Sequence, residues 1–130
     1  GRVVSNFIMQ ALRNENLTIY GDGKQTRSFC YITDLVDGLI KLMESEAIIT
    51  GPVNLGNPGE FTISQLAEKV IMLGDSKSIV EYLSLPDDDP TQRKPDINLA
   101  INQLHWEPKI VLDDGIKNTI NYFKELILST

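Results

Sequence analysis

The feature that most constrains the fold is the run of residues 18–35, where two short apolar segments flank a glycine turn and an arginine. Residues 18–20 predict a short strand, and Gly21-Asp22-Gly23 predicts the turn that ends it. From residue 33 onward the spacing predicts an amphipathic helix, with Asp34 near the favourable end of its dipole. Arg27 therefore lies between two ordered elements, where its permanent charge is held in place.

The rest of the chain continues this alternation. Apolar residues at helical spacing predict helices over 2–13, 62–73, 97–104 and 112–127, and short apolar segments predict strands at 53–55 and 79–82. Thr62 and Gln65 fit a capping box, and Phe61 and Leu66 are placed for the accompanying hydrophobic staple. Each helix has one apolar face, so the sequence predicts an α/β fold of short strands and amphipathic helices.

The composition restricts the class of function. With 130 residues, 42% hydrophobic and 23% charged, the chain has the balance of one soluble globular domain. A net charge of -6 and a pI of about 4.7 argue against a nucleic-acid partner, which requires a basic face. No apolar run is long enough for a membrane helix. The single cysteine, Cys30, excludes an intrachain disulfide and a zinc site built on several thiolates, and we expect it to be a small buried residue.

Two arginines are candidates for binding an anion. Arg27 offers a planar fork of donors that suits phosphate oxygens, although an arginine after a turn can also simply lie on the surface. Arg93 belongs to a polar loop at residues 84–95, and we expect it to converge with Arg27 on one diphosphate. In the same loop, the adjacent residues Asp87–Asp89 lack the spacing of a calcium loop, so no metal site is predicted. Asn54 precedes a glycine turn, where its amide can contact a ligand or bond its own turn backbone.

The sequence has no complete catalytic machinery of its own. His105 lies at a predicted helix end, where a role at the helix dipole is favoured over that of a base. Gly21-Asp22-Gly23 lacks the third glycine and the following helix of a dinucleotide fingerprint, and no P-loop or nucleophile motif is present. These residues alone therefore point to binding and not to unaided chemistry.

Several motifs together resemble one enzyme family. The chain is similar over nearly its whole length to the C-terminal part of UDP-glucuronate decarboxylases, or UDP-xylose synthases, of the extended short-chain dehydrogenase/reductase (NAD-dependent epimerase/dehydratase) family. The motifs that carry the resemblance are Gly1-Arg2-Val3-Val4-Ser5-Asn6-Phe7, Leu17-Thr18-Ile19-Tyr20-Gly21-Asp22-Gly23, Gln25-Thr26-Arg27-Ser28-Phe29, Asp34-Leu35-Val36-Asp37-Gly38-Leu39, Val53-Asn54-Leu55-Gly56-Asn57-Pro58, Asp88-Asp89-Pro90 and Arg93-Lys94-Pro95-Asp96.

The resemblance implies specific roles. It implies an enzyme that binds NAD on an N-terminal Rossmann domain, expected to be absent from this chain, with residues 1–130 forming the C-terminal substrate-binding domain. The implied substrate is a UDP-sugar, with the strand from Thr18 to Tyr20 beside the uracil and Arg27 on the diphosphate. The other implied ligand residues are Arg2, Gln25, Asn54 and Arg93. For Arg93 the family also implies a proton donor after decarboxylation, but an arginine with a pKa above about 12 suits electrostatic stabilisation of the enolate at least as well.

Other functions share part of this pattern. A 4,6-dehydratase or 4-epimerase of the same family has most of these motifs, and the Arg-Lys-Pro-Asp and Asn-Leu-Gly-Asn-Pro runs favour the decarboxylase. A non-catalytic nucleotide-sugar binding module and a purely structural interaction domain are the alternatives outside enzymology. We expect the fragment alone to be inactive and the protein to form homo-oligomers, a homodimer at full length. The compartment is expected to be the cytoplasm for a bacterial or soluble form, and the secretory lumen for a membrane-anchored eukaryotic form.

Overall fold

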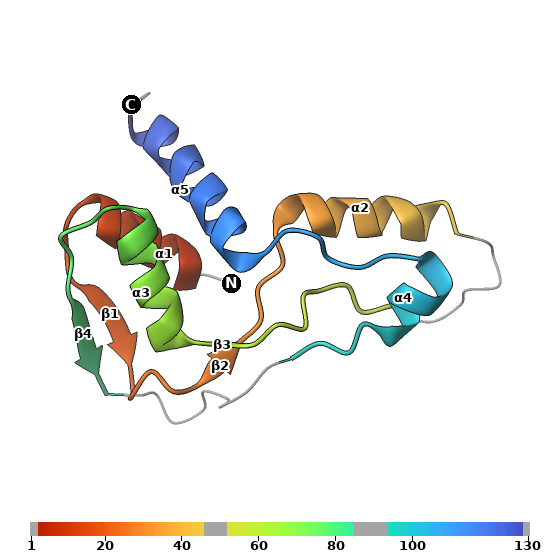
Figure 1. The fold of residues 1–130 in the computed structure, drawn as a ribbon, viewed down its shortest axis with the longest axis horizontal. Helices are drawn as coiled ribbons and strands as arrows, with labels where there is room; N and C mark the ends of the chain where they lie inside the picture. Colours follow the sequence, from red (N-terminus) through yellow and green to blue (C-terminus); the bar gives the residue numbers. More distant parts are fainter. Residues whose placement is uncertain (1–2, 46–51, 85–93, 129–130) are drawn as a thin grey trace.

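The computed structural model describes residues 3–45, 52–84 and 94–128 (Figure 1). In these residues helices and short strands alternate. Their bounds are α1 Val3–Leu12, β1 Leu17–Tyr20, β2 Thr26–Arg27, α2 Ile32–Met43, β3 Phe61–Thr62, α3 Ile63–Leu73, β4 Val80–Leu83, α4 Asn98–Leu104 and α5 Leu112–Leu128. This confirms the predicted α/β class. None of the described helices is both long and apolar enough to span a bilayer.

One lobe is built on a parallel strand pair. β1 pairs with β4 from Leu17↔Val80 to Tyr20↔Leu83, and α1 and α3 lie beside this pair at the left of Figure 1. The alternation in β1 buries Leu17 and Ile19, which pack with the apolar faces of α1, α3 and α5. The buried residues of this core are Phe7, Ile8, Ala11, Leu17, Ile19, Ile63, Leu66, Ala67, Val70, Ile116 and Ile120. The helical spacing seen in the sequence thus identifies the faces that form the core.

A second, smaller core lies at the other end of the molecule, where α2 and α4 pack (Figure 1). Its centre is Trp106, which is 1% exposed and donates its indole N–H to the main-chain oxygen of Asp34 at 2.9 Å. Ile97, Ala100 and Leu104 surround it. A buried Trp satisfies its only donor in this way while its ring supplies apolar contact area.

The predicted capping box is present and helps to place β3. Thr62 is the N-cap of α3, and its hydroxyl accepts from the backbone N–H of Gln65 at 3.0 Å. In return the Gln65 side chain accepts from the N–H of Thr62 at 2.8 Å. β3, directly before this helix, pairs with β2 in antiparallel register, Thr26↔Thr62 and Arg27↔Phe61. The capping box, a signal within four consecutive residues, therefore determines where β3 ends and α3 begins, and β3 is the strand that pairs with β2.

Four predictions about local structure do not hold in full. Residues 53–55 form no strand, because a strand requires a hydrogen-bonded neighbour and no described strand lies beside them. The helix expected from residue 33 begins at Ile32, and its N-cap, Tyr31, makes no side-chain capping bond. Cys30 is only partly buried and packs at the margin of the smaller core. Ile101, predicted to lie on the apolar face of its helix, is 40% exposed.

Candidate functional site

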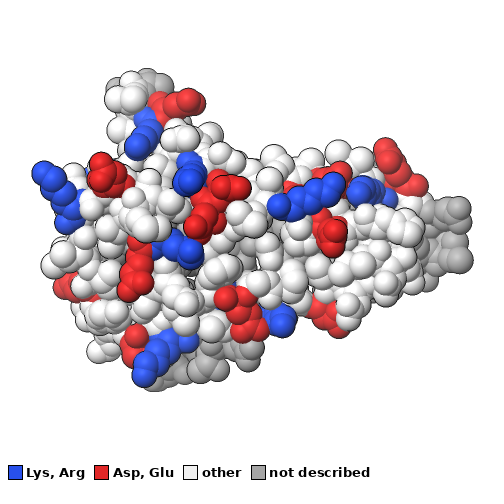
Figure 2. Space-filling model, in the orientation of Figure 1, with Lys and Arg blue, Asp and Glu red and all other residues white. Residues whose placement is uncertain are grey.

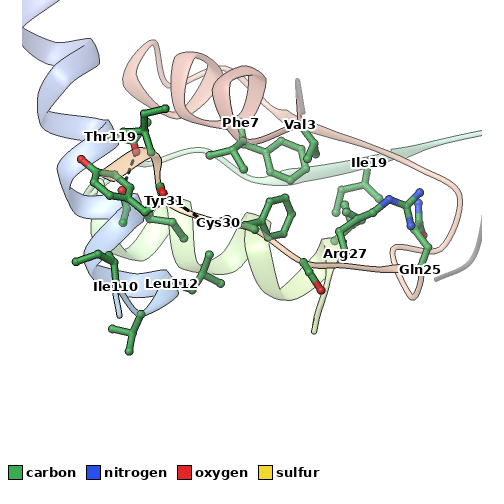
Figure 3. Close-up of a pocket in the computed structure, with 18 of the residues that line it drawn as sticks. Val3, Phe7, Ile19, Gln25, Arg27, Cys30, Tyr31, Ile110, Leu112 and Thr119 are labelled. Carbon is green, nitrogen blue, oxygen red and sulfur yellow. Dashed lines mark hydrogen bonds between the residues drawn. The ribbon is translucent and has the colours of Figure 1, made fainter. Parts of the chain in front are cut away.

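The described structure contains a cavity of about 990 Å³. It lies between α1, β1, β2, the start of α2 and the start of α5 (Figure 3). This volume is at the upper end of the range of small-molecule sites. The lining residues are Val3, Val4, Phe7, Thr18, Ile19, Tyr20, Gln25, Arg27, Ser28, Phe29, Cys30, Tyr31, Ile32, Ile63, Ile110, Val111, Leu112, Gly115, Ile116 and Thr119.

The two ends of the cavity differ in chemistry. Gln25 and Arg27 lie together beside Ile19 at one end in Figure 3, whereas Tyr31, Ile110, Leu112 and Thr119 lie at the other. The first end combines a guanidinium with an amide, and the second is mainly aliphatic and aromatic. An elongated ligand with a charged or polar part would therefore be oriented by the Arg27 end.

The cavity brings together four of the seven residues predicted to bind substrate. Thr18 and Tyr20 come from β1, Arg27 from β2, and Gln25 from the turn that joins them. Gln25 is held there because its amide N–H donates to the main-chain oxygen of Tyr20 at 3.0 Å. Thr18 is tied to α1, since its N–H donates to Gln10 Oε1 at 3.3 Å. The predicted grouping of these four residues is thus seen in the structure, although their contacts with a ligand stay a prediction.

Arg27 is held by backbone pairing and by its own side chain. The backbone of Arg27 pairs with Phe61 across the β2–β3 ladder. The side-chain Nη1 of Arg27 donates to the main-chain oxygen of Thr26 at 2.7 Å. A guanidinium has five N–H donors in a rigid plane, so this bond is compatible with a fork-like contact to an anion. The side chain is partly buried, where a charge–phosphate contact is screened less than at an open surface.

The glycine turn before Arg27 requires its glycines. Gly21 and Gly23 have φ of 88° and 74°, the left-handed region that residues with a Cβ rarely adopt. A Cβ on Gly23 would also collide with the side chain of Ser64 at the start of α3. The Gly23 carbonyl accepts from the N–H of Ser64 at 3.1 Å. The turn is thereby anchored to the same helix that the capping box begins, and the following β2 confirms that Gly21-Asp22-Gly23 opens no helix.

Asp34 builds one wall of the cavity. It is 6% exposed, and its Oδ2 accepts from the N–H groups of Lys109 at 3.0 Å and Ile110 at 2.9 Å. Sequence reasoning gave Asp34 only a role at the helix dipole. Its larger role is to hold the segment before α5, which includes the lining residues Ile110 and Val111. Because the partners lie 75 and 76 positions away in sequence, no local pattern could reveal this contact.

Of the other predicted site residues, the structure describes only Asn54. Asn54 does not line the cavity, and its amide donates to the main-chain oxygen of Asp96 at 3.3 Å. Arg2 and Arg93 lie outside the described residues, as do Asp87–Asp89, so the predicted convergence of Arg27 with Arg93 stays a prediction. His105 is the C-cap of α4, with φ of 52°, which agrees with its predicted place at a helix end.

Ser28 is a lining residue that the sequence did not single out. Its hydroxyl oxygen is buried and has no hydrogen-bond partner among the described residues. A buried hydroxyl without a partner costs about 1–3 kcal/mol of folding free energy in proteins. Next to Arg27 in sequence, Ser28 is therefore a polar group that the chain's own contacts leave unsatisfied. The residue type does not indicate that a serine hydroxyl is buried without a hydrogen-bond partner, so the sequence could not predict this feature of Ser28.

Cys30 lines the cavity as a protonated thiol. Burial raises its pKa above the ordinary value, and the nearby negative charge of Asp34 raises that pKa further. Both effects disfavour the thiolate, which is the nucleophilic form. The site thus offers binding groups and no activated cysteine.

The surface charges are mixed on the face shown in Figure 2. Lysine and arginine side chains lie among aspartates and glutamates over the described part of this face. Within the described residues, ion pairs join Lys41 to Asp37 at 3.6 Å and Lys69 to Asp113 at 2.8 Å. This distribution differs from the continuous basic stripe typical of a nucleic-acid interface.

Comparison with known proteins identifies the relatives of this chain. Residues 1–56 match the model of the NAD dependent epimerase/dehydratase family. UDP-glucuronic acid decarboxylase 1 of Arabidopsis thaliana is 52% identical over 129 residues, which are 99% of this chain and 29% of that protein. The chain therefore spans less than a third of the length of this curated relative.

Solved structures share the fold. UDP-glucuronic acid 4-epimerase of Bacillus cereus, in complex with UDP-glucuronic acid and NAD, superposes with a TM-score of 0.89 at 30% identity, over 95% of this chain and 40% of that one. UDP-glucose 4-epimerase of Thermotoga maritima, with UDP-glucose, gives 0.90 at 29% identity, over 96% of this chain and 40% of that one. The mixed helix and strand architecture is thus that of the extended short-chain dehydrogenase/reductase enzymes.

Proposed function

We propose that this chain is the C-terminal, sugar-nucleotide-binding part of a UDP-glucuronate decarboxylase of the NAD dependent epimerase/dehydratase family, whose model matches residues 1–56. The observation that carries this proposal is the grouping of Thr18, Tyr20, Gln25 and Arg27 around a single cavity. The 52% identity to a UDP-glucuronic acid decarboxylase supports decarboxylation over the other reactions of the family.

The proposed binding mode follows the polarity of the cavity. Arg27 contacts the diphosphate, because its planar donors match phosphate oxygens and its backbone is fixed by the β2–β3 pair. The edge of β1 from Thr18 to Tyr20 borders the uracil. Gln25 lies between the uracil contacts of β1 and the diphosphate contact of Arg27. Arg2, Asn54 and Arg93 complete the proposed set of substrate contacts.

The proposed reaction converts UDP-glucuronate to UDP-xylose and CO₂. Bound NAD supplies the oxidation at C4 of the sugar and the later reduction, and the β-keto acid formed between these steps loses its carboxylate. Arg93 is proposed to stabilise the enolate that decarboxylation leaves. In the described residues the glycine turn 21–23 leads into β2 and not into a helix, so it is no dinucleotide site. We assign NAD binding to a part of the whole protein outside this chain.

Product analysis of the full-length protein tests the proposal. With UDP-glucuronate and NAD, we expect release of CO₂ and formation of UDP-xylose. Two solved relatives at about 30% identity are 4-epimerases, so the second candidate activity is 4-epimerisation of the same kind of substrate. Formation of UDP-galacturonate without CO₂ would favour the epimerase and overturn the decarboxylase. Absence of both products, with UDP still bound, would favour a non-catalytic binding module.

Substitution of Arg27 tests the binding mode. Loss of a fork-like phosphate contact worth about 3 kcal/mol corresponds to a rise of about 100-fold in the KM for UDP-glucuronate in Arg27→Ala. Arg27→Lys is expected to recover part of this loss, since lysine keeps the charge but not the planar fork. Arg13→Ala is the matched control, because Arg13 is exposed beyond α1 and does not line the cavity. Equal KM values in Arg27→Ala and Arg13→Ala would reject the role of Arg27.

We also propose that the full-length protein is a homodimer. The support within this chain is a line of exposed apolar side chains along α2, namely Ile32, Val36, Leu39, Ile40 and Met43. Such faces favour burial against another surface. Sedimentation of the full-length protein is expected to give a dimer, and a monomer at micromolar concentration would contradict the proposal.

A further inference from the structure

The segment 28–31 joins β2 to α2 and runs along the cavity. All four of its residues line that space (Figure 3), and Ser28 is the first of them. The segment is held on two sides, because Phe29 packs against the larger core and Cys30 against the smaller one. Directly before it, Arg27 belongs to the β2–β3 ladder. The backbone of Ser28 therefore has a fixed place on the cavity wall.

The Ser28 hydroxyl differs from other hydroxyls of the described residues. Its oxygen is the one buried side-chain polar atom among them that has no hydrogen-bond partner. By contrast, the partly buried Ser45 hydroxyl donates to the main-chain oxygen of Leu42 at 2.6 Å. The Thr119 hydroxyl, on the same cavity wall, donates to the main-chain oxygen of Gly115 at 2.7 Å. A buried polar group without a partner is rare in proteins, and on a cavity wall the missing partner can be a ligand.

The neighbouring charge indicates which ligand group fits. The Cα atoms of Arg27 and Ser28 are about 3.8 Å apart, the spacing across any trans peptide bond. Ser28 lies beyond the end of β2, so the two side chains are not confined to opposite faces of a strand. A diphosphate presents several anionic oxygens close together. These oxygens can accept the planar donors of Arg27 and, beside them, the O–H of Ser28.

We propose that Ser28 is a further substrate-binding residue, whose hydroxyl donates to an oxygen of the diphosphate beside Arg27. The residue is only partly buried, and its Cα–Cβ bond allows three staggered positions of the hydroxyl. In the free protein the hydroxyl stays unpaired, which disfavours the folded state, and on binding it turns to the phosphate oxygen. The inference rests on the proposed function, in which Arg27 contacts the diphosphate of a UDP-sugar.

Titration calorimetry of the full-length protein with UDP tests this contact. Ser28→Ala is expected to raise the Kd for UDP by about 10-fold, the effect of one hydrogen bond to a charged group. The melting temperature of the free variant is expected to be unchanged or higher, because no partner is lost. Ser45→Ala is the matched control: it removes a serine hydroxyl that has a partner and does not line the cavity, so its Kd for UDP should equal that of the wild type.

Two results of this titration would overturn the proposal. The first is an equal Kd for UDP in the wild type, Ser28→Ala and Ser45→Ala. The second is a clear fall in the melting temperature of free Ser28→Ala, or its failure to fold, because the hydroxyl would then have a structural partner. Weaker UDP binding together with an undiminished melting temperature is the combination that a merely structural serine would not give.

Two further ligands locate the contact. Uridine lacks phosphate, so its Kd is expected to be the same in the wild type and Ser28→Ala, whereas UDP-glucuronate should show the same loss as UDP. A loss with uridine, or a loss with UDP-glucuronate alone, would overturn the diphosphate contact. A wild-type protein that binds UDP but forms no UDP-xylose rejects the proposed decarboxylation, and the UDP titration still judges Ser28. A wild-type protein that does not bind UDP rejects both proposals.

Discussion

Removal of the Asp34 carboxylate should loosen one wall of the cavity by a predictable amount. Its Oδ2 accepts from the N–H groups of Lys109 and Ile110, and the side chain is 6% exposed. A hydrogen bond to a charged group contributes about 1.5–3 kcal/mol. Because the two bonds share one oxygen, we take the lower value for each and expect Asp34→Ala to destabilise this contact by about 3 kcal/mol. The indole bond of Trp106 goes to the main-chain oxygen and is retained in the variant.

Amide hydrogen exchange measures this loss where it occurs. About 3 kcal/mol corresponds to about 100-fold faster exchange of the Lys109 and Ile110 amides, provided that opening is a rapid pre-equilibrium. Asp37→Ala on the same helix is the control, since Asp37 is 49% exposed and makes only an i,i+4 pair with Lys41 at 3.6 Å. Such a pair contributes less than about 0.5 kcal/mol. If both variants exchange equally at Lys109 and Ile110, the carboxylate does not hold this wall and the reasoning is refuted.

Three smaller perturbations test other parts of the structure. Thr62→Ala removes the capping bond to Gln65 and should lower the free energy of unfolding by about 1 kcal/mol; an unchanged urea midpoint would speak against it. Ser28→Ala removes an unpartnered buried hydroxyl and should leave the melting temperature unchanged or raise it; a clear decrease would show that Ser28 has a partner. The raised pKa of Cys30 means that the folded state holds the thiol proton more tightly than the unfolded state does. The free energy of unfolding should therefore fall as the pH rises from the ordinary thiol pKa through the higher pKa of the folded state. Alkylation of Cys30 by iodoacetamide should likewise require a higher pH than alkylation of an exposed cysteine. Asp34→Ala should shift the pH profile of this alkylation to lower pH. If Cys30 of the wild-type protein had the same profile as free cysteine, its raised pKa would be contradicted.

The parts of the fold that local patterns determine were predictable. The capping box at Thr62 and the glycine turn before Arg27 depend on residues within a few positions of each other, and both are present. The strand expected at 53–55 failed for the opposite reason. A β-type pattern states only that a segment can pair, and the partner is a property of the whole fold.

The candidate site was predictable where residue type limits the chemistry. Arg27 could be identified as a candidate because a guanidinium held in place is well suited to binding an anion such as a phosphate or a carboxylate. The roles of Asp34 and Ser28 could not be predicted, since each depends on the surroundings created by distant parts of the chain. For Asn54 the sequence left two roles open, and the structure shows it bonded to the Asp96 carbonyl.

The parallel pairing of β1 with β4 has a consequence for biosynthesis. The first paired residues, Leu17 and Val80, are separated by 63 positions (80 minus 17), and the intervening chain must fold back before the ladder forms. Contacts between such distant residues form late, because the entropy of closing the loop is lost before the contact is gained. On the ribosome, the β1 edge of the cavity therefore stays unsupported until residue 83 has left the exit tunnel. The pairing that supports this edge of the proposed sugar-nucleotide site is thus completed by residues more than 60 positions further along the chain.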